Sequence, residues 1–168
     1  WSPAPWTNID LMKATAEFGG AISGCTQIRD FTIRVVGVCI PYHMANPFGQ
    51  IPATPPWEQH ERFLRALAPY LRRWRQEGPV IVVGDFNRKI PRAKRTPRKS
   101  FVILEDAFRE YQIATEGTIE PLGSQTIDHV AFAGRFDVAR VEGLSAVTEQ
   151  GLVRSDHFGV VVDFELQR

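Results

Sequence analysis

The sequence contains few cysteines and no long apolar run. Its two cysteines, Cys25 and Cys39, are too few for a disulfide framework, and both occur in apolar, strand-like surroundings. This favours buried free thiols and a reducing compartment. No apolar stretch is long enough to span a membrane, and no signal-peptide pattern is present. We therefore expect a cytoplasmic protein that does not enter the membrane. The first residue is Trp1, not Met, so we expect a processed, trimmed or partial chain.

The chain also lacks an overall charge of either sign, because its formal net charge is +1. The basic residues are nevertheless concentrated in one segment, residues 88–99, which contains no acid. Two prolines, Pro91 and Pro97, predict an irregular loop there. Such a run is either a solvated surface or a contact for a polyanion. The seven basic residues of this segment are Arg88, Lys89, Arg92, Lys94, Arg95, Arg98 and Lys99.

Hydrophobic patterning predicts a single mixed α/β domain over residues 1–168, which is long enough to bury a core. Continuous apolar runs indicate buried strands, and the run over 158–166 alternates as a strand with one buried face does. Residues 41–56 form a proline-rich loop with no predicted secondary structure. Helices are predicted over 9–18, 57–76 (with a kink at Pro69) and 101–111, and strands over 21–28, 31–40 (a hairpin), 80–84, 126–133, 136–141 (its neighbour) and 158–166.

The strand over 80–84 ends in polar residues that could form a site. Gly84 is followed by Asp85, Phe86 and Asn87. If the chain stays extended, the carboxylate and the amide project to the same side. The carboxyl end of a buried strand is a preferred place for ligands in layered sheets. Asp and Asn after a glycine are equally typical of a turn.

Two further strand ends carry acidic residues, and together the motifs form an ordered set. The sequence has Gly-Asp-Phe-Asn at 84–87, Ile-Asp-His at 127–129 and Ser-Asp-His-Phe-Gly-Val at 155–160. This set resembles the endonuclease/exonuclease/phosphatase superfamily of DNase I-like and exonuclease III-like enzymes. The resemblance runs from about Gly19 to the end and matches the carboxyl-terminal portion of that domain. It implies a four-layer α/β sandwich from which the amino-terminal strands are missing here.

The resemblance also implies a chemistry, divalent-metal-dependent hydrolysis of phosphodiester bonds with Mg²⁺ or Mn²⁺. By this resemblance, Asp85 orients the attacking water or protonates the leaving group, and Asn87 contacts the phosphate and the metal site. His157 is similar to the phosphate-binding histidine, and Asp128 to the carboxylate that orients it. Asp156 is similar to a metal-site carboxylate. The residue types suit this chemistry, because carboxylates suit hard cations and a histidine held by a carboxylate stays cationic more easily.

Two departures from the family pattern qualify this prediction. No stretch matches the early strands that carry a Glu metal ligand and an Asn in the family, and Cys39 stands where family members have His or Tyr. His43 is a candidate to replace that residue. We expect little Mg²⁺-dependent activity from residues 1–168 alone, and more from a version extended at its amino end.

The substrate class remains open at this point. DNA, RNA, nucleotides, phosphoinositides and sphingomyelin all contain suitable bonds, and the basic segment favours nucleic acid. No obligate protein partner is evident. The alternative is a catalytically incomplete fragment or degenerate domain that only binds polyanions. The candidate substrate-binding residues are His43, Arg88, Lys89, Arg92, Lys94 and Arg95.

Overall fold

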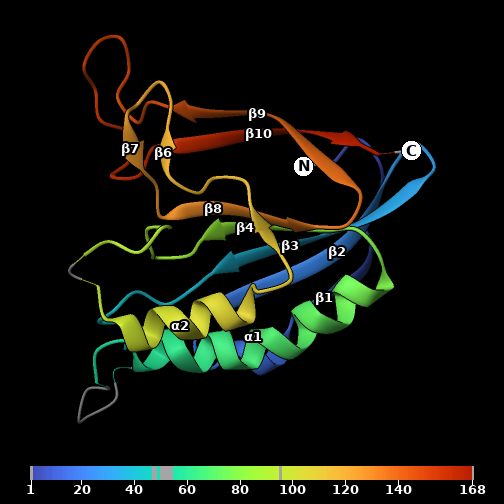
Figure 1. Ribbon diagram of the computed structural model, residues 1–168, viewed down its shortest axis with the longest axis horizontal. Coiled ribbons are helices and arrows are strands. Elements are labelled where there is room, and N and C mark those ends of the chain that lie inside the picture. Colours follow the sequence, from blue (N-terminus) through green and yellow to red (C-terminus); the bar gives the residue numbers. More distant parts are fainter. Residues whose placement is uncertain (1, 47–48, 50–54, 95, 168) are drawn as a thin grey trace.

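The computed structural model describes residues 2–46, 49, 55–94 and 96–167. Two α-helices, one short 3-10 helix and ten strands occur in these residues (Figure 1). The helices are η1 (Lys13–Thr15), α1 (Glu58–Glu77) and α2 (Arg98–Ala107). The strands are β1 (Thr7–Asp10), β2 (Gly20–Ile28), β3 (Phe31–Cys39), β4 (Val80–Asp85), β5 (Gln112–Ile113), β6 (Thr118–Ile119), β7 (Ser124–Gln125), β8 (Asp128–Ala133), β9 (Phe136–Leu144) and β10 (Gly159–Leu166).

A six-stranded mixed sheet with the order β1-β2-β3-β4-β8-β5 lies at the centre of the molecule. Strands β3 and β4 are parallel and are connected through α1, whereas β2–β3 and β4–β8 are antiparallel. Helices α1 and α2 cover one face of this sheet, and the antiparallel pair β9–β10 lies over the other (Figure 1). Three of the four predicted layers are therefore present. Among the described residues, no helix covers the outer face of β9–β10.

Strands β3 and β4 are packed on both faces, as their unbroken apolar sequences predict. Val36, Val38, Val80 and Val82 belong to the main core beneath the helices. On the helix side this core includes Leu64, Leu67, Leu71 and Trp74, each at most 1% exposed. Fully burying one such aliphatic side chain contributes about 1.5–3 kcal/mol. The smaller core on the opposite face is formed by Ile33, Phe132 and Phe136, with Phe164 of β10 packed against it.

Several sequence predictions are confirmed. Strands β2 and β3 form the predicted hairpin around Arg29 and Asp30, with continuous pairing from Gly20–Cys39 to Ile28–Phe31. The helix predicted over 57–76 is α1, which continues through Pro69. No helix among the described residues combines the length and the apolar character that crossing a membrane requires.

Other predictions differ from the structure in the type, pairing or bounds of an element. Residues 9–18 do not form an α-helix: Ile9 and Asp10 belong to β1, which pairs with the edge of β2, and the Met12 N–H donates to Oδ1 of Asp10, where the chain turns. Only the short 3-10 helix η1 follows. Strands β8 and β9 are not neighbours in one sheet, because β9 pairs with β10. The second helix begins at Arg98, directly after Pro97. A proline is tolerated there because the first N–H groups of a helix have no partner within it.

Candidate active site

Three strands of the central sheet end side by side, and their last or first residues form a row. Cys39 of β3 is in register with Asp85 of β4, which is in register with Asp128 of β8. Since Val82 and Val38 face the helices and side chains alternate along a strand, the row faces the opposite side. Cys39 is exposed in this row, so the expectation of a buried thiol is wrong for this residue and correct for Cys25.

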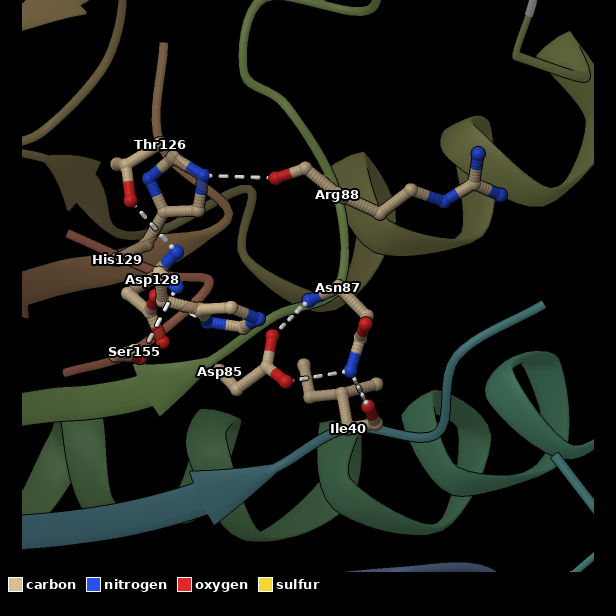
Figure 2. A network of polar contacts seen from close by, with 9 residues as sticks. Ile40, Asp85, Asn87, Arg88, Thr126, Asp128, His129 and Ser155 are labelled. Atoms are coloured by element: carbon tan, nitrogen blue, oxygen red, sulfur yellow. Dashed lines mark hydrogen bonds and ion pairs between the residues drawn. The ribbon is translucent and has the colours of Figure 1, made fainter. Parts of the chain in front are cut away.

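Asp85 and Asn87 contact each other directly (Figure 2). The backbone N–H of Asn87 donates to Oδ1 of Asp85 at 2.7 Å, and its side-chain Nδ2 donates to Oδ2 at 2.7 Å and to the Ile40 carbonyl at 2.8 Å. Asn87 has a left-handed backbone with φ 52°. The chain is thus not extended here: the segment is a turn, as one of the two interpretations held. The turn itself orients the carboxylate.

Gly84 allows β4 to reach the position from which Asp85 projects. Its φ is 138°, and a Cβ placed there would lie 2.0 Å from the Val38 carbonyl oxygen. Backbone bonds fix the two residues after Gly84, because the Ile40 N–H donates to the Asp85 carbonyl at 2.8 Å and the Phe86 N–H donates to the Ile127 carbonyl at 2.9 Å. No other residue type suits position 84 without displacing the end of β3.

The predicted contact between Asp128 and His157 is present. Nδ1 of His157 lies 2.7 Å from Oδ2 of Asp128, so Nδ1–H donates, and no described residue forms a hydrogen bond with Nε2. The Asp128 N–H donates to Thr126 Oγ1, and the His157 N–H donates to Ser155 Oγ, which hold the two loops (Figure 2). Partial burial lowers the pKa of His157, but the carboxylates of Asp128, Asp85 and Asp156 raise it by more, and its pKa lies above the ordinary value.

Asp85 shares this environment. Burial raises the pKa of its carboxyl, and the nearby charge of Asp128 adds to the effect, while the hydrogen bonds from Asn87 and the charge of His157 act in the opposite direction; the net result is a raised pKa. A carboxylate with a raised pKa is a stronger base than a free aspartate.

A cavity of about 230 Å³ lies beside the hydrogen-bonded pair Asp128–His157. Besides that pair, its lining includes Lys89, Asp156 and Phe158. Both Asp156 and Lys89 are exposed. The structure thus brings Asp156 and Lys89 next to the Asp128–His157 pair, with an ammonium and an imidazole at one opening.

The donor atoms in this row suit a divalent cation. One ligand atom each from Asp85, Asp128 and His157 lie within 4.8 Å of one another. Two carboxylates provide the oxygen ligands that Mg²⁺ and Mn²⁺ prefer, and an imidazole is better suited to Mn²⁺ than to Mg²⁺. Both N–H bonds of the Asn87 amide are used, and no described residue donates to its oxygen, which leaves that oxygen available as a further ligand. Asp156, which the resemblance implied as a ligand, is not part of this compact group.

The basic segment is only partly the exposed surface that the sequence predicted. Lys89, Lys94, Arg98 and Lys99 are exposed. Arg98 and Lys99 belong to the first turn of α2, not to a loop. Arg95 lies outside the described residues.

Arg88 and Arg92 differ from the expectation. Arg88 is only 2% exposed, because its guanidinium packs on the ring of Trp57, with Cζ 3.4 Å from the ring centroid. The guanidinium of Arg88 is therefore shielded from solvent and is not available to bind a substrate, contrary to the prediction. Nη1 of Arg92 donates to the Thr96 carbonyl at 2.5 Å, which ties the segment back on itself.

His43 lies in the loop after β3 and stacks on Trp57, with ring centroids 5.4 Å apart. In the described part of the chain, His43 forms no hydrogen bond, ion pair or ring contact with Asp85, Asp128 or His157. The interpretation of His43 as a replacement for the family residue at position 39 therefore has no contact in its support.

Two buried histidines received no role from the sequence, His60 and the histidine of the Ile-Asp-His motif, His129. His60 donates from Nδ1 to the Pro41 carbonyl at 2.8 Å, and its Nε2 accepts from Nε of Arg88 at 3.4 Å. His129 donates from Nε2 to the Arg88 carbonyl at 2.8 Å (Figure 2). Neither position has a motif spacing that would distinguish a positioning histidine from an ordinary core histidine.

Known structures provide a comparison for this arrangement. No family model matches the sequence, and no curated protein matches it. Among solved structures, D. rerio TDP2 complexed with a single-strand DNA product has a TM-score of 0.63 at 10% identity over 96% of this chain and 68% of its own. The human Nocturnin catalytic domain with bound sulfate has a TM-score of 0.54 at 19% identity, over 89% of this chain and 53% of its own.

A Bacteroides thetaiotaomicron endonuclease/exonuclease/phosphatase family protein has a TM-score of 0.59 at 16% identity, over 88% of this chain and 56% of its own. The chain spans between about half and two thirds of the length of these three proteins. These likenesses show that the chain has the DNase I-like fold of endonuclease/exonuclease/phosphatase proteins, and the sequence resemblance is confirmed for the fold.

Proposed function

We propose that this chain contains the active centre of a divalent-metal-dependent phosphodiesterase. The observation that supports the proposal best is the close group of Asp85, Asp128 and His157 at the end of three neighbouring strands, with Nδ1 of His157 already occupied by Asp128. Phosphodiester cleavage needs a base for water and positive charge at the phosphate oxygens. Asp85 is the base, a protonated His157 supplies part of the positive charge, and the carboxylates of the group would help to hold a divalent cation that would supply the rest.

Each residue has a role that follows from its contacts. Asp85 orients the attacking water and accepts its proton, since burial raises the pKa of its carboxyl. His157 is more easily protonated than a free histidine, and its Nε2–H donates to a non-bridging phosphate oxygen. Asp128 keeps that ring in position. Asn87 donates to both oxygens of Asp85, and its amide oxygen would be one ligand of a bound cation. A bound divalent cation would supply charge neutralisation and a more acidic water.

Nucleic acid is the substrate that we propose. The exposed side chains of Lys89, Lys94, Arg98 and Lys99 support this choice, because lysine and arginine neutralise backbone phosphates. One of the structurally similar proteins is described with a single-strand DNA product.

The test is hydrolysis of bis-p-nitrophenyl phosphate with Mg²⁺ or Mn²⁺ and with a chelator, for residues 1–168 and for the longest natural chain that contains them. Asp85→Asn and His157→Gln should each lower kcat/KM by about 10²–10³-fold. Asp30→Asn, in the exposed β2–β3 turn, is the matched control and should leave the rate unchanged. Hydrolysis that survives Asp85→Asn, or that needs no metal, would contradict the proposal.

The second candidate is a domain that binds polyanions without cleaving them, and the same exposed cations favour it. Replacing Lys94, Arg98 and Lys99 by glutamine should weaken binding of a single-stranded oligonucleotide. If all three contact phosphates, the slope of log affinity against log salt should become shallower by about 2, at ~0.7 for each contact. Fluorescence anisotropy at several salt concentrations measures this slope.

A matched triple variant separates a local contact from a general charge effect. Arg62, Arg65 and Arg73 are exposed on α1, and replacing them removes the same charge. This control should keep the wild-type slope. Equal slopes for both triple variants would mean that the segment after β4 is only a solvated surface.

A further inference from the structure

Arg88 immediately follows Asn87, and its side chain is one of the largest fully buried groups in the protein. Burial lowers the pKa of Arg88 to about 10, so the guanidinium is still charged at neutral pH. Burying a cation is unfavourable unless specific partners compensate. The partners of Arg88 therefore indicate why the charge is there.

The side chain of Arg88 joins the beginnings of both helices. Its guanidinium carbon lies 3.4 Å from the centroid of the Trp57 ring, directly before α1. Nε donates to Nε2 of His60 in the first turn of α1, and Nη2 donates to Oγ of Ser100 in the first turn of α2. Of the described residues, none accepts a hydrogen bond from Nη1.

The main chain of Arg88 is held from the opposite side. Its carbonyl oxygen accepts from Nε2 of His129 at 2.8 Å (Figure 2). The Thr115 hydroxyl donates to Nδ1 of that histidine at 2.9 Å and accepts the Val130 N–H at 3.1 Å. Burial lowers the pKa of His129, which favours the neutral ring that this chain of bonds requires.

These contacts bear on the residue before Arg88. Asn87 has φ 52°, and left-handed backbone is unfavourable for residues other than glycine, although asparagine tolerates it better than most. In that conformation the Asn87 N–H and Nδ2 both reach the carboxylate of Asp85. The sheet fixes the backbone at Asp85, and the contacts of Arg88 fix it one residue after Asn87. These two constraints favour the left-handed conformation of Asn87.

We propose that Arg88 is a positioning residue that holds Asn87 in its left-handed conformation and so fixes the Asp85 carboxylate opposite His157. The catalytic consequence of this role rests on the phosphodiesterase function proposed above. Its structural consequence does not, because the geometry of Asn87 can be measured without any substrate.

Lysine should not replace arginine at this position. A guanidinium is planar, stacks on an indole face and donates in several fixed directions at once. An ammonium at the end of a lysine chain cannot reach His60 and Ser100 together while it covers Trp57. Arg88→Lys, which keeps the charge, therefore separates geometry from electrostatics.

The first experiment is NMR spectroscopy of the wild type, Arg88→Lys and Arg88→Met. A residue with positive φ has a strong intraresidue NOE between its amide and α protons, and the hydrogen-bonded Asn87 amide should be protected from exchange. Both features should be lost in the two variants, while the rest of the spectrum keeps its folded pattern. Arg65→Met, the same substitution at an exposed site on α1, should leave Asn87 unchanged.

The second experiment is kinetic. In both Arg88 variants kcat for bis-p-nitrophenyl phosphate should fall by about 10²-fold with KM changed little, because a catalytic group displaced by about 1 Å loses that much. In Arg88→Ala, added guanidinium ion at millimolar concentration should restore part of kcat and the Asn87 NOE. A residue that only stabilised the fold would lower the melting temperature without these effects.

The outcomes separate the two proposals. If the longest natural chain that contains residues 1–168 hydrolyses no phosphodiester, the proposed function fails, and the NMR measurement still decides the role of Arg88. If Arg88→Met keeps the Asn87 NOE and its exchange protection, the positioning role is overturned. Should Arg88→Met not fold, Ser100→Ala removes one contact and must weaken the protection of Asn87; unchanged protection there overturns the proposal too.

Discussion

Acid should destabilise this protein through His60 in particular. His60 is completely buried, and burial lowers its pKa to about 4, with the charge of Arg88 acting in the same direction and the bond to the Pro41 carbonyl opposing it. The reason is visible in the contacts: Nε2 accepts from Nε of Arg88, so a proton on Nε2 would remove that bond and place two cations together.

The magnitude follows from the difference between the folded and unfolded pKa. With about 4 in the folded state and 6.5 in the unfolded chain, the unfolded state binds the proton first. Neutral His60 therefore makes its full contribution to the free energy of unfolding above pH 6.5. This contribution is lost as the pH falls towards 4, at about 1.4 kcal/mol for each pH unit. Between pH 7 and pH 5 the free energy of unfolding should fall by about 2 kcal/mol on account of His60 alone.

Urea unfolding followed by tryptophan fluorescence at pH 7, 6 and 5 measures this loss. His60→Gln keeps an acceptor for Arg88 but does not titrate, so it should be less stable at pH 7 and should lose about 2 kcal/mol less than the wild type on acidification. His129 titrates in both proteins and cancels in the difference. His43→Gln, in an exposed position, is the control. Parallel pH curves for the wild type and His60→Gln would refute the reasoning.

Three further predictions concern the row at the strand ends. Gly84→Ala should lower the free energy of unfolding by at least about 3 kcal/mol in urea titrations, because the alanine Cβ would lie 2.0 Å from a β3 carbonyl oxygen at a residue with φ 138°. The control Gly20→Ala, with open space around it, should change stability little. A small loss of stability at both sites would contradict this geometry. Asp128→Asn should lower the pKa of His157 in NMR titrations, since that carboxylate raises it; an unchanged pKa would mean that the pair is not coupled. The same variant should speed alkylation of Cys39, followed by mass spectrometry at neutral pH, because burial and then the charges of Asp85 and Asp128 raise the pKa of its thiol.

The strand that carries Asp85 could be predicted because its signal is local: an unbroken β-branched run ends in a glycine within residues 79–84. The turn at Asp85 and Asn87 was one of two interpretations that the sequence left open. The contact between Asp128 and His157 was predicted from the resemblance to the family, and it is present at 2.7 Å. The proposed roles of both pairs remain predictions.

The edge strand β1 and the pairing of β9 with β10 could not be predicted in the same way. Thr7 pairs with Cys25, and Gly159 pairs with Leu144. A β-strand is stabilised by its neighbours, so residues that look helical by themselves can join a strand when a sheet edge is available. This explains the start of the error over residues 9–18, because Ile9 and Asp10 belong to β1.

The residue types and their order, taken alone, determined the chemistry available to this protein: carboxylates, an amide and a histidine next to strand ends, and a cluster of basic residues after one of them. Only the tertiary structure decided which of these side chains meet and which are buried. Arg88 is the clearest case, because Lys89, the next residue, is exposed, while the partners of Arg88 come from the beginnings of two helices. A charged side chain is buried where partners from distant segments compensate its lost hydration, and no local pattern records that compensation.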